Sequence, residues 1–137
     1  MKNFNKIILS LGSNIGDKKS NLETAINQIN QFSRIKKISS IYESDPILLK
    51  DQDNFFNLVL EIDYKKTVKY GPRIIDIDIV FFNNQIVNSK DLVIPHYDWS
   101  NRVFVVKPLC ELYKEFNMQD YKLDVQKINK VGRVNTN

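Results

Sequence analysis

The sequence predicts one α+β domain, residues 1–137, built on an antiparallel sheet. A single helical pattern near the N-terminus is followed by several apolar runs that have the two-residue period of strands. Few residues separate the run that ends at 64 from the run that begins at 69, which favours an antiparallel arrangement. With 42% hydrophobic and 26% charged residues, a chain of this length can bury one core without disulfides.

Charge and cysteine usage narrow the classes of function. The net charge of +4 favours anionic ligands, although it does not separate nucleotide phosphates from nucleic acid. Cys110 is the only cysteine, so an intramolecular disulfide is excluded and a reducing compartment is favoured. The apolar run near the N-terminus is too short for a signal peptide or a membrane span. We therefore expect a cytoplasmic protein with no membrane partner.

The first third of the chain predicts a strand, a loop, a helix and a second strand. Residues 6–11 are an apolar strand, and the GSNIGD loop at 12–17 supplies a glycine for a turn and polar residues for a helix cap. Apolar residues then recur with helical spacing at Leu22, Ala25, Ile26, Ile29 and Phe32. Residues 34–42 are rich in β-branched side chains, and a polar loop containing Pro46 follows.

Two longer strands are predicted next. Residues 54–64 alternate between one face of Phe56, Leu58, Leu60 and Ile62 and another of Phe55, Asn57, Val59 and Glu61. The run at 69–82 is expected to place Ile75, Ile77, Ile79 and Phe81 on one side and Asp76 and Asp78 on the other. Beyond residue 116, a short helix is expected to be anchored by Leu123, Val125 and Ile128.

Asp76 and Asp78 are the most informative pair, because two carboxylates on one strand face repel unless a positive group neutralises them. Mg²⁺ suits such a pair, since it prefers one or two carboxylates completed by water and phosphate oxygens. The alternative is an edge strand whose inward charges prevent aggregation. Arg73, three residues before the first acid, favours a phosphate contact beside a metal.

Two further pairs are candidates for ligand binding. Phe55 and Asn57 share a strand face, where a ring beside an amide can stack on a flat heterocycle and read its edge; packing under a loop explains the pair equally. His96, the only histidine, and Arg102 lie in one polar loop and suit either a phosphate contact or an ordinary surface. A single histidine argues against a histidine-rich metal site and against a nucleophilic triad.

Five stretches of the chain occur together in one order: LGSNIGD, SSIYESDP, DQDNFFN, GPRIIDIDI and IPHYDWSNRVFVVKPL. They resemble the 6-hydroxymethyl-7,8-dihydropterin pyrophosphokinase family over about residues 7 to 113. The resemblance implies a ferredoxin-like α+β sandwich and an ATP-dependent diphosphokinase. Such an enzyme transfers pyrophosphate from ATP to the hydroxymethyl group of 6-hydroxymethyl-7,8-dihydropterin and releases AMP, in folate biosynthesis.

The resemblance also implies which residues bind the pterin. Phe55 and Phe104 are expected to sandwich the ring, and Asn57 is expected to hydrogen-bond its edge. The loop of Ser44, Asp45, Pro46 and Ile47 is expected to contact the pterin through main-chain groups. This loop departs from the family pattern at Ser44 and Asp45, where the family usually has Thr-Pro or similar.

The resemblance also implies which residues bind Mg²⁺ and ATP. Asp76 and Asp78 resemble the ligands of two Mg²⁺ ions that bind with ATP. The residues expected to contact ATP are Arg73, Ile79, His96, Tyr97 and Arg102. Arg73 and Arg102 are also the expected catalytic residues, and no general base is assigned.

One part of the family pattern is missing. About twenty family positions, which carry a core helix and a mobile catalytic loop, have no counterpart near Thr67 and Val68. One helix of about four turns covers about half of a four-stranded sheet, so a helix is missing or the sheet pairs with another chain. Either the gene carries a deletion, or the sequence holds only the ordered part of a longer chain. We favour the second, because loss of a core helix should destabilise so small a domain; an intact mass near 16.1 kDa would indicate the first.

Two other functions stay open at this point. One is a non-catalytic remnant that binds pterin or nucleotide without the loop. The other is a basic nucleic-acid module, against which the strand acids and the missing aromatic signature argue. We expect a monomer that binds ATP and the pterin but no nucleic acid, alone or within a larger folate enzyme.

Overall fold

The computed structural model describes residues 5–46, 53–64, 76–83, 86–90 and 92–135. The strands are β1 (Ile7–Ser13), β2 (Ser33–Ile38), β3 (Ile41–Ser44), β4 (Phe55–Tyr64), β5 (Asp76–Phe82), β6 (Val87–Asn88), β7 (Val93–Ile94) and β8 (Ile128–Gly132). The helices are α1 (Lys18–Ile29) and α2 (Val103–Leu112), with 3₁₀ turns η1 (Trp99–Asn101) and η2 (Met118–Asp120). No helix in these described ranges has the length and apolar character needed to cross a bilayer.

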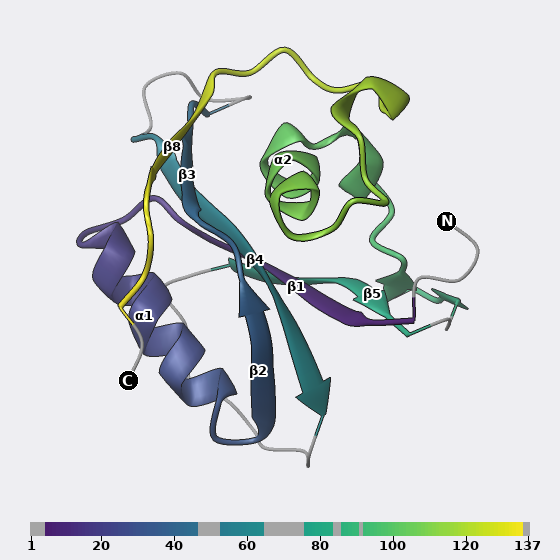
Figure 1. Cartoon of the computed structure of the whole chain (residues 1–137), viewed down its shortest axis with the longest axis horizontal. Helices are drawn as coiled ribbons and strands as arrows, with labels where there is room; N and C mark the ends of the chain where they lie inside the picture. Colours follow the sequence, from purple (N-terminus) through teal and green to yellow (C-terminus); the bar gives the residue numbers. More distant parts are fainter. Residues whose placement is uncertain (1–4, 47–52, 65–75, 84–85, 91, 136–137) are drawn as a thin grey trace.

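The main sheet is antiparallel throughout, as the sequence predicts. Its strand order is β5-β1-β4-β3-β8, and β2 pairs with the second half of β4. Strands β2 and β3 therefore follow one another along the same edge of β4 (Figure 1). Strands β6 and β7 form a separate two-stranded sheet.

Helix α1 covers one face of the sheet and confirms the predicted helical spacing. Its buried stripe consists of Leu22, Ala25, Ile26 and Ile29, which pack with the inward residues of β1 and β4. Asp17 caps the helix by accepting a hydrogen bond from the Ser20 amide at 3.1 Å. Each fully buried aliphatic side chain contributes about 1.5–3 kcal/mol, so this stripe outweighs the cap in fixing the helix.

Helix α2 covers the opposite face, so the two helices lie on either side of the sheet (Figure 1). The sequence pattern does not predict this helix. Its β-branched residues and Pro108 favour a strand or a turn. Helical spacing instead lets Val105 and Leu109 pack with Ile8 and Val59, and this burial outweighs the weak local propensity. The sheet therefore has an apolar core on both faces.

The predicted alternation of β5 is wrong at Phe81. Ile8 pairs with Phe81, whereas the next residue of β1, Leu9, pairs with Ile79. Val80 is therefore the extra residue of a β-bulge. Phe81 consequently joins Val80 in the α2-side core, while Ile77 and Ile79 pack on the α1 side. One inserted residue thus moves the ring to the other face.

The predicted C-terminal helix anchored by Leu123, Val125 and Ile128 is also wrong. Val125 is fully exposed, and Ile128 begins strand β8. The open edge of β3 offers backbone partners to this segment, and β8 pairs with it from Gly132 opposite Ile41 to Ile128 opposite Ser44. Pairing with the edge of β3 therefore determines the structure of this segment, and its weak helical pattern does not.

Candidate active site

One row of residues crosses four strands and brings the predicted metal and pterin positions together. Asp76 on β5 pairs with Gly12 on β1, Gly12 pairs with Asn57 on β4, and Asn57 pairs with Tyr42 on β3. Asn57 lies on the face of the sheet that α2 covers, since Val59, two residues further along β4, packs with α2. Two inter-strand spacings, about 9–10 Å, separate the positions of Asp76 and Asn57.

Gly12 is a site residue that sequence reasoning missed, because its loop was interpreted only as a turn and a helix cap. Gly12 lies within β1, and a Cβ atom on it would stand 2.9 Å from the Asn57 Oδ1 atom. Any side chain would therefore displace the Asn57 carboxamide. A glycine inside a strand is itself a signal of such a close approach.

The Asn57 carboxamide is held in one orientation. It is 3% exposed, and its Nδ2 atom donates a hydrogen bond to the Ser44 hydroxyl at 2.7 Å. Its oxygen points toward Gly12. Phe55 pairs with Ser44 across the strands and shares the face of Asn57, as predicted. The amide that is expected to read a heterocycle is thus oriented in advance by β3.

Asp78 stands one row further along β5 and contacts a guanidinium and an imidazole. Its Oδ2 atom accepts a hydrogen bond from Arg102 Nη1 at 3.3 Å and lies 3.8 Å from His96 Nε2. Arg102 Nε also reaches Asp98 Oδ2 at 3.4 Å. The side chain of Asp78 remains 40% exposed. The structure therefore joins three predicted residues from β5, the loop after β7 and the start of α2.

Backbone contacts fix the His96 loop against β5. The His96 amide donates to the Val80 carbonyl at 3.0 Å, and the Asp98 amide donates to His96 Nδ1 at 3.2 Å. Since Nδ1 accepts, the neutral imidazole carries its proton on Nε2, the atom that faces Asp78. Burial, and then the Arg102 charge, lower the pKa of His96, although the two nearby carboxylates oppose this. His96 is therefore neutral at pH 7.

Aromatic rings support the same corner. Tyr97 stacks on the His96 ring with centroids 4.8 Å apart and is 75% exposed. The Arg102 guanidinium lies 6.0 Å from the Tyr97 ring centroid and 5.5 Å from that of Phe104. Phe104 is half-buried at the start of α2 and packs against the α2-side core. Rings and carboxylates together hold Arg102 in place while leaving part of its charge accessible.

Asp76 and Asp78, two residues apart on β5, are the positions that could hold Mg²⁺ together with phosphate oxygens. Gly12 is the β1 partner of Asp76, and Ser10 is the β1 partner of Asp78. Within the described residues, no group of three or more potential metal ligands occurs. A metal held by this pair would therefore need oxygens from the substrate.

Two predicted site residues lie outside the described part of the chain, and the side chain of a third faces away from this group. Arg73 and Ile47 lie outside the described residues. Ile79 packs against the α1-side core, on the face opposite Asp78. Its side chain does not face the candidate site, and an adenine contact at Ile79 stays a prediction.

The sequence is similar to proteins of one enzyme family. The family model described as 7,8-dihydro-6-hydroxymethylpterin-pyrophosphokinase matches residues 8–69 and 61–114. The 2-amino-4-hydroxy-6-hydroxymethyldihydropteridine pyrophosphokinase of Bacillus subtilis is 33% identical over 129 residues, covering 78% of this chain and 77% of that protein. The Aquifex aeolicus protein of the same name is 36% identical over 126 residues, covering 77% and 79%.

Some relatives are much longer. The bifunctional protein FolKE of Lactococcus lactis subsp. cremoris is 36% identical over 126 residues, covering 76% of this chain and 36% of that protein. The chain thus spans about a third of the length of that relative.

The comparisons also locate a gap. The Aquifex alignment has 126 positions but uses 77% of the 137 residues, about 105, so about twenty positions have no counterpart here. The two segments matched by the family model meet at residues 61–69, where the sequence analysis placed the missing positions. The match extends over more than half of the chain, and the chain belongs to the 7,8-dihydro-6-hydroxymethylpterin-pyrophosphokinase family.

Proposed function

We propose that this protein transfers the pyrophosphoryl group of ATP to the hydroxymethyl oxygen of 6-hydroxymethyl-7,8-dihydropterin, with release of AMP, in folate biosynthesis. The observation that carries the proposal is the row from Asp76 through Gly12 to Asn57, in which an acid position and an oriented amide are in register across three strands. Membership of the pyrophosphokinase family supports the same reaction.

The pterin occupies the end of the row at β3 and β4. Asn57 hydrogen-bonds the heterocycle edge, and Phe55 and Phe104 stack on its two faces. Main-chain groups of Ser44, Pro46 and Ile47 complete the contacts. The buried Ser44–Asn57 hydrogen bond supports this placement, because it fixes which atom of the amide meets the ligand.

ATP occupies the other end, beside β5. Asp76 and Asp78 would hold two Mg²⁺ ions together with the phosphates, and Mg²⁺ would neutralise the charge that develops on the transferred group. Arg73, His96, Tyr97 and Arg102 contact the phosphates and ribose. Ile79 neighbours the adenine through its main chain, since its side chain packs on the α1 side. Arg102 can bind a phosphate because the side chain of its partner Asp78 is 40% exposed, so that a phosphate can replace the Asp78 carboxylate.

The protein's own contribution to catalysis is placement and charge. Asn57 and the rings fix the hydroxymethyl group, and Arg73 and Arg102 bind the phosphates, so the attacking and leaving oxygens are held in line. Arg102 balances negative charge on the transferred group. We assign no general base among these residues.

We further propose that the chain is one cytoplasmic domain, residues 1–137, and acts as a monomer or as part of a larger folate enzyme. Fusion is supported by the long Lactococcus relative, whose name describes it as bifunctional.

Incubation with ATP and Mg²⁺ tests the proposed reaction. AMP should accumulate only when 6-hydroxymethyl-7,8-dihydropterin is present, and omission of Mg²⁺ should abolish its release. Calorimetric binding of both ligands without AMP release would contradict the proposal and identify a binding remnant. Release of AMP without pterin would identify a different reaction.

A further inference from the structure

The C-terminal segment, residues 126–133, lies directly against the candidate pterin loop. It includes β8, which pairs with β3 and forms the edge of the main sheet (yellow in Figure 1). The match to the family model ends at residue 114. The contacts of this segment with the site therefore lie beyond the matched part of the chain.

Three polar groups of Asp45 form hydrogen bonds with the C-terminal segment. The Lys127 amide donates to Asp45 Oδ1 at 2.8 Å, and the Asp45 amide donates to the Lys127 carbonyl at 3.3 Å. The Gln126 side-chain amide donates to the Asp45 carbonyl. Asp45 lies between Ser44 and Pro46, whose main-chain groups are assigned to the pterin. These bonds fix the backbone on both sides of one residue of the loop.

The same segment also supports the Asn57 carboxamide, which is proposed to hydrogen-bond the pterin edge. Ile128 pairs with Ser44 at the end of β3, and Ser44 receives the hydrogen bond from Asn57. A displacement of residues 126–128 would therefore move Ser44, and with it the carboxamide of Asn57. Gln126 is thus connected to Asn57 through its hydrogen bond to Asp45, the peptide bond from Asp45 to Ser44, and the hydrogen bond between Ser44 and Asn57.

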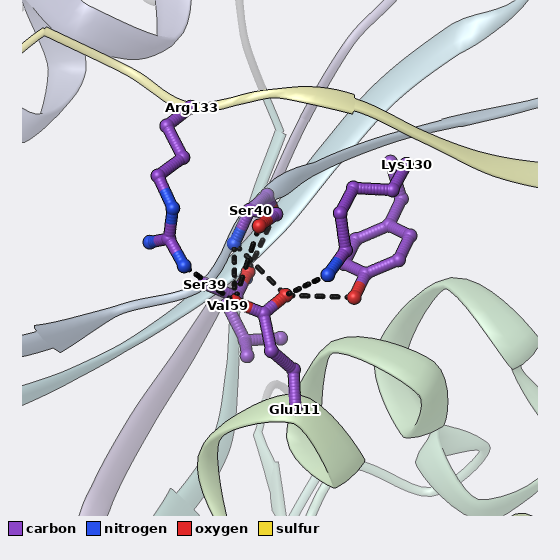
Figure 2. A network of polar contacts seen from close by, with 7 residues as sticks. Ser39, Ser40, Val59, Glu111, Lys130 and Arg133 are labelled. Carbon is purple, nitrogen blue, oxygen red and sulfur yellow. Dashed lines mark hydrogen bonds and ion pairs between the residues drawn. The ribbon is translucent and has the colours of Figure 1, made fainter.

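The far end of the segment is anchored to α2 through Glu111. Arg133 Nη2 donates to Glu111 Oε2 at 3.2 Å, and Lys130 Nζ lies 3.9 Å from Oε1 (Figure 2). The same carboxylate accepts hydrogen bonds from the Ser40 amide and hydroxyl and from the Tyr42 hydroxyl. Figure 2 shows Glu111 reaching from α2 to β3 and to the C-terminal segment. The segment is thus fixed at both ends relative to β3.

We propose that the C-terminal segment is a positioning element of the pterin site, with Asp45 and Gln126 as its coupling residues. This inference rests on the proposed function, since it concerns the same pterin loop. Neither residue is assigned to the chemistry. Their role is to set the loop backbone and the Asn57 amide, so their loss should weaken pterin binding and leave ATP binding unchanged.

Three substitutions test the coupling. Asp45→Ala removes the acceptor for the Lys127 amide, and Asp45→Asn keeps an acceptor oxygen of the same shape. Gln126→Met removes the donor to the Asp45 carbonyl while keeping the side-chain volume. It also removes Gln126 Oε1, a buried oxygen with no hydrogen-bond partner among the described residues, so its effects on stability partly cancel.

Steady-state kinetics separate positioning from simple destabilisation. Asp45→Ala and Gln126→Met should each raise the KM for pterin by about threefold to tenfold, the scale of one lost hydrogen bond, with the KM for ATP unchanged. Asp45→Asn should restore most of the pterin KM. Val125→Ala, at the exposed neighbouring position, is the matched control and should behave as the unmodified protein.

Two outcomes would overturn the inference. One is an unchanged pterin KM in both Asp45→Ala and Gln126→Met. The other is a parallel loss of pterin and ATP affinity together with a lower melting temperature, which indicates a structural role only. Failure of the proposed function is distinguishable, because the unmodified protein would then release no pterin-dependent AMP.

Discussion

Asp78 carries the closest charge contacts in the candidate site. Its carboxylate lies within 4 Å of both Arg102 and His96, and neighbouring Asp76 is predicted to share its metal. Alternation along a strand is enough to predict that the two acids share a face, and it also predicts the partnership of Phe55 with Asn57. The role of Gly12 could not be predicted in the same way, because it depends on which residue of β4 lies opposite.

Asp78→Asn should lower pterin-dependent AMP formation at saturating ATP by about 100-fold or more, since one of the two charges proposed to bind the metal is lost. The melting temperature should change by no more than about 3 °C, because partly exposed ion pairs contribute little stability. Asp63→Asn is the matched control: Asp63 pairs with Arg34 at 3.2 Å on the same sheet, away from the site. Full activity in Asp78→Asn would contradict the assignment.

Gly12→Ala should weaken pterin binding by about tenfold, because the added methyl group displaces the Asn57 carboxamide. Calorimetry with pterin and a non-hydrolysable ATP analogue measures this. Gly16→Ala provides a contrast: its Cβ meets nothing within 4 Å, but its φ of +65° strains alanine. It should lose about 1 kcal/mol of stability and keep pterin affinity. Equal pterin affinity in both variants would refute the role of Gly12.

At the scale of elements, α1 and the central strands follow from their periodicity, whereas α2 and β8 do not. Residues 103–112 contain three valines and a proline, so local propensity argues against the helix that burial on the sheet stabilises. Strand β8 is polar and depends on the unpaired edge of β3. The bulge at Val80 likewise follows from pairing with β1. Contacts between residues far apart in the sequence therefore determine α2, β8 and the bulge.

Glu111 joins α2, β3 and β8, and its removal should show how strongly these elements depend on one another. Glu111→Gln should lower the free energy of unfolding at pH 7 by about 1–3 kcal/mol, because a partly buried, hydrogen-bonded charge is lost. Glu115→Gln, at an exposed position four residues on, should change little. Urea denaturation of both variants measures the difference.

The effect of Glu111 should depend on pH with a defined sign. Burial alone would raise the pKa of Glu111, but hydrogen bonds from Tyr42 and Ser40 and the charge of Lys130 lower it below 4.5. The carboxylate therefore stabilises the fold fully above pH 4.5, and this contribution is lost as the pH falls through the lower folded-state pKa. The stability gap between unmodified protein and Glu111→Gln should narrow below pH 4.5. A gap that widens on acidification would contradict the network.

At the scale of the whole molecule, the sheet is the part that unites the site. It carries the acids on β5, the glycine on β1, the amide on β4 and the loop after β3, and α2 adds Arg102 and Phe104 from one side. About twenty positions of the aligned relatives have no counterpart between β4 and β5. We therefore expect this sheet, together with α2, to support pyrophosphoryl transfer.

The fate of the terminal phosphates of ATP distinguishes pyrophosphoryl transfer from other reactions. With ATP labelled at the γ-phosphate, we expect one labelled pterin product that carries two added phosphoryl groups, formed in equal amount to AMP. Asp78→Asn should form neither product at a comparable rate. Label recovered in inorganic phosphate, or ADP formed in place of AMP, would show that the protein does not transfer pyrophosphate to the pterin.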